Sequence, residues 1–114
     1  MRVFALLTLL VALSGCGQKA TRTEIRIRNA SDQDFQAVVV GGVRFGDIKE
    51  GAATDYQIFP VAFEIADANL IVRSNRLSFT PIDYVGYQPL GRGRFSYALS
   101  IERGRLRIRL ERDK

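Results

Sequence analysis

Short alternations of apolar and polar residues fill the chain after residue 22. Glu24–Arg28 places Ile25 and Ile27 between charged residues, which is the two-residue period of a strand with one buried face. The turn-forming residues 29–33 end this segment. A second strand is predicted over residues 35–40, where apolar residues occupy both faces and leave the register open.

A hairpin is predicted next, because Gly41-Gly42 can adopt the positive φ angles of a two-residue loop. Residues 43–45 form its returning strand and residues 46–53 a loop. Residues 56–59 resume the strand pattern, and Pro60 marks an edge or a bend.

The middle of the chain allows two interpretations. Residues 61–65 and 70–73 are strand-like on either side of a polar break at residues 67–69, whereas a helix over residues 61–72 lacks capping residues. A turn at Ser74-Asn75 would place Val72 opposite Leu77 and Leu70 opposite Phe79.

The last hairpin gives the clearest pattern. A loop at Arg103-Gly104 makes one side of the ribbon wholly apolar, with the pairs Ile101–Leu106, Leu99–Ile108 and Tyr97–Leu110. The other side carries Arg105, Arg107 and Arg109. About seven short strands with regular turns predict an all-β fold, an antiparallel β-sandwich formed by residues 23–114 as a single domain.

Residues 89–97, PLGRGRFSY, resemble the start of a late strand in immunoglobulin-like and transthyretin-like modules. The resemblance implies a sandwich of that kind. Such modules often place a tyrosine at this corner, whereas Phe95 has no hydroxyl to bond across it. Residues 81–90 also resemble segments of small, uncharacterised bacterial lipoproteins, a likeness that implies no activity.

The N-terminus has the layout of a cleaved export signal. Arg2 precedes an eleven-residue, largely apolar run, Val3–Leu13. A membrane-spanning helix needs about 20 apolar residues, so this run is too short to cross a bilayer. A basic start, a short apolar stretch and small residues are typical of a signal peptide, here predicted over residues 1–15.

Leu13-Ser14-Gly15-Cys16 resembles the lipobox of bacterial lipoprotein precursors. The resemblance implies that signal peptidase recognises Leu13, Ser14 and Gly15. It also implies that Cys16 carries a diacylglyceryl group and an N-acyl chain. Residues 16–22 would then be a short lipidated tether in the cell envelope. Position 17 is a glycine and not the aspartate that retains such proteins at the inner membrane. The outer membrane is therefore favoured in a Gram-negative organism.

Composition excludes much of the common catalytic chemistry. The chain has no histidine, which removes Ser-His and Cys-His nucleophiles and the commonest transition-metal ligand. Its only cysteine is assigned to lipid, so no disulfide is expected. Asp32 and Asp34 fit a turn better than a calcium site. We therefore expect no enzymatic activity, no metal, no small-molecule substrate and no cofactor other than the covalent lipid.

Positive charge is concentrated near the C-terminus. Residues 92–114 hold eight basic and three acidic residues, whereas residues 16–91 are close to neutral. Arg105, Arg107 and Arg109 could contact anionic headgroups, the phosphates of lipopolysaccharide or an acidic protein. The sequence favours the alternative that they protect an exposed strand edge, because Glu102, across from Arg105, partly neutralises them. Nucleic acid is not expected as a partner of an exported protein.

Tyr84 and Tyr87 are candidate partner contacts, because tyrosine buries area and still offers a hydrogen bond. Tyr84 could instead pack under its loop, with Asp83 capping a turn. The resulting hypothesis is a lipid-anchored, non-catalytic binding or assembly module with an envelope protein as partner. The alternative is a structural protein whose basic C-terminal hairpin contacts anionic headgroups or lipopolysaccharide.

Overall fold

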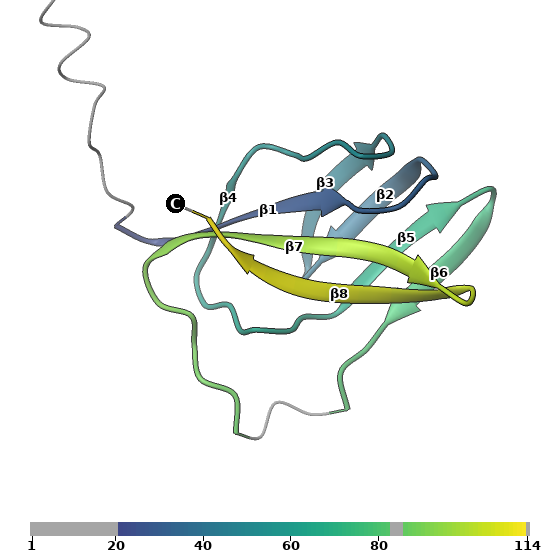
Figure 1. Ribbon diagram of the computed structural model, residues 1–114. Coiled ribbons are helices and arrows are strands. Elements are labelled where there is room, and N and C mark those ends of the chain that lie inside the picture. Colours follow the sequence, from purple (N-terminus) through teal and green to yellow (C-terminus); the bar gives the residue numbers. More distant parts are fainter. Residues whose placement is uncertain (1–20, 83–85, 114) are drawn as a thin grey trace, which may run out of the picture.

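The computed structural model describes residues 21–82 and 86–113 as a β-sandwich of two four-stranded sheets (Figure 1). The proposed signal peptide, Cys16 and Tyr84 lie outside the described residues. The strands are β1 (Thr23–Asn29), β2 (Phe35–Val40), β3 (Val43–Ile48), β4 (Gln57–Phe59), β5 (Ala68–Val72), β6 (Asn75–Phe79), β7 (Gly93–Glu102) and β8 (Arg105–Arg112). The predicted all-β sandwich is confirmed, and the described residues contain eight strands rather than about seven.

Sheet A has the order β4-β1-β7-β8, and its central pair is parallel. β1 runs beside β7 from Thr23, opposite Gly93, to Asn29, opposite Leu99. The sequence predicted antiparallel pairing throughout. This pair is the exception, because the first strand lies beside a strand some 70 residues later and runs in the same direction.

Sheet B has the order β3-β2-β5-β6, with antiparallel neighbours. β2 contains the irregularity that its apolar sequence left open. Its register shifts around Ala37, which has a φ of 51° and turns away from the core. Phe35 before the bulge and Val38 and Val40 after it are all buried. The extra residue therefore shifts the alternation by one position, so that Val38 and Val40 face the core.

The core lies between the sheets. Its fully buried side chains come from both layers, with Ile25, Ile27, Tyr97 and Leu99 in sheet A facing a second group in sheet B. That second group is Phe35, Val38, Val40 and Leu70. The Tyr97 hydroxyl donates to the Phe63 carbonyl at 2.5 Å, which ties the β4–β5 connection to the centre of sheet A.

Three local predictions were wrong. Residues 61–65 are neither a strand nor part of a helix; they form an irregular segment that buries Ala62. Residues 46–48 belong to β3 and not to the following loop, because Ile48 pairs with Phe35.

The β5–β6 turn falls at Arg73-Ser74, where both residues have positive φ, rather than at Ser74-Asn75. Leu77 therefore lies opposite Leu70 and not opposite Val72. This shift of two positions leaves every side chain on its predicted face.

The last hairpin matches its prediction. The turn is at Arg103-Gly104, and the three apolar pairs have the predicted register. Glu102 lies opposite Arg105, also as predicted. β8 and β6 are the outermost strands of their sheets on the same side of the sandwich, where the two strands contact each other.

The chain enters the fold at one end of sheet A. The Gly93 amide donates to the Arg22 carbonyl at 3.0 Å, and the Thr23 hydroxyl donates to the Gly91 carbonyl at 2.5 Å. β7 is ten residues long, which is about 30 Å at roughly 3.3 Å per residue. The Arg103-Gly104 turn therefore lies at the end of sheet A away from Arg22 (Figure 1).

No helix that is long and apolar enough to cross a membrane occurs in residues 21–82 and 86–113.

Asn29, the last residue of β1, holds several backbone segments together through its side chain. Its side chain is fully buried and donates to the carbonyls of Gln33, at 2.7 Å, and Ile48, at 3.0 Å. Its Oδ1 accepts from the amide and the hydroxyl of Ser31, at 3.0 and 2.7 Å. One side chain thus joins the β1–β2 loop to the end of β3.

We predict that Asn29→Ala lowers the free energy of unfolding by about 2–4 kcal/mol, because it removes several hydrogen bonds to buried polar groups. Urea unfolding followed by circular dichroism measures the change. Asn75→Ala, at an exposed position, is the control and should stay within about 0.5 kcal/mol of the parent protein. Equal effects of the two substitutions would contradict this role for Asn29.

Candidate functional site

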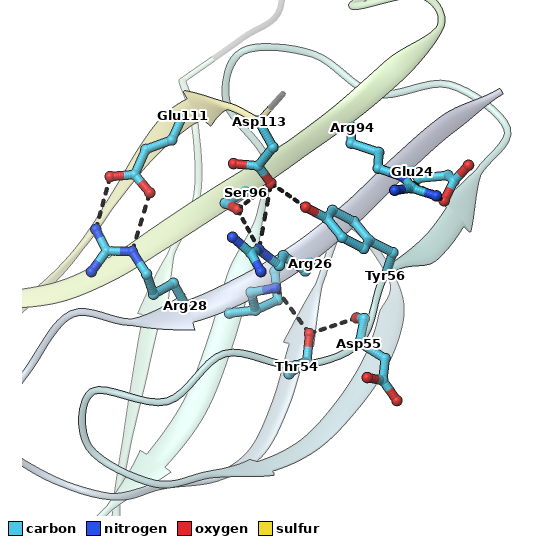
Figure 2. Close-up of polar contacts among 11 residues, drawn as sticks. Glu24, Arg26, Arg28, Thr54, Asp55, Tyr56, Arg94, Ser96, Glu111 and Asp113 are labelled. Atoms are coloured by element: carbon cyan, nitrogen blue, oxygen red, sulfur yellow. Dashed lines mark hydrogen bonds and ion pairs between the residues drawn. The ribbon is translucent and has the colours of Figure 1, made fainter. Parts of the chain in front are cut away.

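The outer face of sheet A carries a network of charged and hydroxyl side chains (Figure 2). Asp113, just after β8, accepts from the Tyr56 hydroxyl at 2.6 Å and from the Ser96 hydroxyl at 2.7 Å. The Arg26 Nε lies 3.4 Å from the same carboxylate and donates to Ser96 Oγ at 2.9 Å. Side chains from β1, from β7 and from the segment before β4 therefore meet at the carboxylate of Asp113.

Tyr56 is held from its ring as well as from its hydroxyl. The guanidinium groups of Arg26 and Arg94 lie 5.2 and 5.3 Å from the ring centroid, within the range of cation–π attraction. Burial, and then the hydrogen bond to Asp113, raise the pKa of the Tyr56 hydroxyl. Arg94 also pairs with Glu24 at 3.4 Å. The ring fixes the segment before β4 against the sheet.

A second cluster lies further along the same face. Arg28 donates through Nε and Nη2 to the two oxygens of Glu111, at 3.1 and 2.8 Å, and Arg109 donates to Glu111 at 3.0 Å. These hydrogen bonds, first that from Arg28 and then that from Arg109, lower the pKa of Glu111 to about 2. The same hydrogen bond raises the pKa of Arg28.

This network fits the joining of strands better than chemistry on a substrate. Ser96 is 1% exposed, so its hydroxyl is not open to a ligand from solvent. No group of three or more potential metal ligands of the His, Cys, Asp and Glu types occurs among the described residues. What the network does is pair the arginines of β1 with the carboxylates at the end of β8.

The arginines of β8 differ from one another in this respect. Arg105, Arg107 and Arg109 all point outward, as predicted, but Arg109 is paired with Glu111. Arg105 and Arg107 have no carboxylate within ion-pair distance among the described residues, although Glu102 is the cross-strand neighbour of Arg105. Of these three arginines, the two without a carboxylate partner in the described part of the chain are those nearer the Arg103-Gly104 turn.

Tyr87 lies beside an apolar hollow of about 630 Å³ that is formed by the segments on either side of residues 83–85. Ile82 is fully exposed at its rim, and Tyr87 is 38% exposed. The other lining residues are Ile65, Phe79, Thr80, Pro81 and Gly86. A surface of this kind suits an apolar or aromatic group better than a charged one.

The two regions chosen from the sequence, Tyr87 and the β8 arginines, lie close to each other. A groove of about 390 Å³ between β6 and β8 is lined by Arg105 and Arg107 and also by Phe79 and Thr80. These last two residues line the hollow at Tyr87 as well. The end of β6 thus connects the predicted partner contact with the predicted anionic contact.

No family model matches this chain, and no curated protein shows significant sequence similarity to it.

The network on sheet A was missed from the sequence. The polar positions of β1, Glu24, Arg26 and Arg28, indicated a solvent-facing stripe. The carboxylate partners of Arg26 and Arg28, which are Asp113 and Glu111, follow β1 by more than 80 residues and come together with it only through the parallel pairing of β1 with β7.

We predict that the Arg28–Glu111 pair makes stability depend on acid pH. The folded-state pKa of Glu111, about 2, lies below its ordinary value of 4.5, so the stabilisation is present above pH 4.5. It is lost as the pH falls from 4.5 towards 2. Glu111→Gln should therefore lower the free energy of unfolding by about 1–2 kcal/mol at pH 7, a figure reduced because the pair faces solvent and salt screens it.

Urea unfolding at several pH values measures this difference, which should shrink to near zero at pH 2. Glu102→Gln is the matched control, since Glu102 forms no ion pair among the described residues. A difference for Glu111→Gln that stays constant across the pH range would argue against the pair.

Proposed function

We propose that this chain is a lipid-anchored lipoprotein of the bacterial cell envelope that acts by binding a partner protein and has no catalytic role. Cys16 carries the lipid, and Leu13, Ser14 and Gly15 direct cleavage before it. The outer membrane is the destination where the organism has two membranes. Residues 1–15 supply the signal and residues 16–22 the tether.

One observation carries the binding proposal: Arg22, where the chain enters the fold, and the unpaired Arg105 and Arg107 lie at different ends of sheet A. Arg22 is bonded to Gly93 at the start of β7, whereas Arg105 lies opposite Glu102 at its end. The six residues that follow Cys16, up to Arg22, reach at most about 20 Å when fully extended. An upright domain therefore presents Arg105 and Arg107 away from the membrane that holds the anchor.

A second candidate function is contact with anionic headgroups or lipopolysaccharide. It is favoured by the exposure of Arg105 and Arg107 without carboxylate partners in the described part of the chain. It requires the outer face of sheet A to lie along the membrane. The cations that β1 and β7 carry on that face, Arg26, Arg28 and Arg94, are already paired with Asp113, Glu111 and Glu24, so these two strands offer little attraction.

The anchor is tested by Cys16→Ser in the full chain. We expect an uncleaved or soluble form, detected by cell fractionation and by the mass of the purified protein, whereas the parent protein is cleaved, acylated and retained in the membrane fraction. Ser14→Ala, which keeps a small residue next to the cleavage site, is the control and should be processed normally. Normal cleavage and retention of Cys16→Ser would refute lipid anchoring.

The kind of partner is tested by a photoreactive phenylalanine derivative at position 87, with crosslinking in intact cells and mass spectrometry of the adducts. Since the hollow at Tyr87 shares Phe79 and Thr80 with the β6–β8 groove, we expect a discrete protein adduct that weakens when Arg105 and Arg107 are both changed to serine. The same probe at the exposed Gln36 is the control for chance encounters. Adducts with lipid or lipopolysaccharide alone would overturn the protein-binding proposal in favour of headgroup contact.

A further inference from the structure

The side of the sandwich between β6 and β8 is open at the level of the backbone. Each strand is the last of its sheet, and neither pairs with a further strand in the described part of the chain. The groove between them is lined by residues 77–80 on the β6 side and residues 104–107 on the β8 side. Its walls are therefore two strand edges, with Leu77, Phe79 and Leu106 supplying apolar surface.

The hydrogen-bond phase of the last hairpin shows which backbone groups reach this edge. Arg103 and Gly104 both have positive φ, as in a two-residue turn whose flanking residues, Glu102 and Arg105, form a hydrogen-bonded pair. Bonded and non-bonded pairs alternate along an antiparallel ladder. The Asp113 amide donates to the Arg94 carbonyl at 2.9 Å, as expected if every second pair counted from Glu102–Arg105 is hydrogen-bonded. The amides of Leu106, Ile108 and Leu110 therefore point away from β7.

The side chains next to these amides carry uncompensated charge. Arg105 and Arg107 alternate with Leu106 and Ile108 along β8 and lie on the outer face. An added strand would place its own residues across from both arginines, at positions two apart. Its intervening residues would face inward, toward the apolar surface of the groove.

We propose that the free edge of β8 binds an extended acidic segment of the partner protein as an additional strand, an inference that rests on the proposed binding function. The segment alternates carboxylate and apolar residues. Its carboxylates pair with Arg105 and Arg107, and its backbone bonds to Leu106 and Ile108. The hollow at Tyr87, which shares Phe79 and Thr80 with the groove, takes an apolar side chain beyond this stretch.

Charge complementarity selects this occupant over a lipid surface or a second copy of the chain. A headgroup has an anion but no peptide groups to continue the ladder, so it leaves the β8 edge unused. A second β8 edge brings its own arginines, which oppose close pairing with Arg105 and Arg107.

The test uses the full-length, isotope-labelled protein in a mild detergent and a capped peptide of alternating glutamate and valine as long as β8. We expect chemical-shift changes centred on β8 and slower hydrogen exchange at the Leu106 and Ile108 amides. Arg105→Ser and Arg107→Ser should each weaken the affinity about two- to five-fold, as for exposed ion pairs. Arg109→Ser is the matched control with little effect, because Glu111 already occupies Arg109.

Two further peptides separate strand addition from general charge attraction. A lysine–valine peptide should not bind, and a peptide with the same glutamates and valines in two separate blocks should bind more weakly than the alternating one. Equal affinity for the blocked peptide, or binding without protection of Leu106 and Ile108, would overturn the proposal. This outcome is independent of the Cys16→Ser fractionation, so failure of strand addition and failure of lipid anchoring are told apart.

Discussion

The parallel pairing of β1 with β7 is the constraint on which the rest of the structure depends. It runs from Thr23 opposite Gly93 to Asn29 opposite Leu99, and it places Ile25 beside Phe95 and Ile27 beside Tyr97 at the centre of the core. Burial of these large side chains is worth roughly 1.5–3 kcal/mol each. A slip of one residue would turn them outward and their charged neighbours inward, so the core fixes the register.

This register also decides which charges meet on the outer face. With Ile25 and Ile27 inward, Arg26 and Arg28 must point outward, beside Ser96 and Ala98. β8 places Glu111 opposite Ser96, and Asp113 follows two residues later opposite Arg94, so each carboxylate reaches an arginine of β1 diagonally across β7: Glu111 pairs with Arg28 and Asp113 with Arg26. The carboxylates at the C-terminal end of the chain are thereby used to neutralise β1. The two arginines nearest the turn, Arg105 and Arg107, lie beyond the reach of this compensation.

Much of the local structure could be predicted from the sequence, because hairpins are specified by neighbouring residues. Alternation and glycine placed the turns at Gly41-Gly42 and Arg103-Gly104, and the pairs of the last hairpin followed. The β5–β6 turn was misplaced because Arg73 and Ser74 adopt positive φ without glycine, which composition does not signal. The pairing of β1 with β7 has no local signature. The sequence pattern predicted the stripe of three arginines. It could not predict that Arg109 alone of the three pairs with Glu111, because that contact depends on the packing of the folded sheet.

The two interpretations of the arginine stripe, edge protection and recognition, describe one physical property. A row of arginines beside a free strand edge opposes pairing with any strand that carries the same charge, including the edge of another copy. The same field attracts a strand of opposite charge, and the unpaired amides of Leu106 and Ile108 let such a strand continue the sheet. Arg109 differs from the other two, since it already donates to Glu111. Selectivity for an acidic segment therefore depends on Arg105 and Arg107, which lie too far along β8 to pair with Glu111.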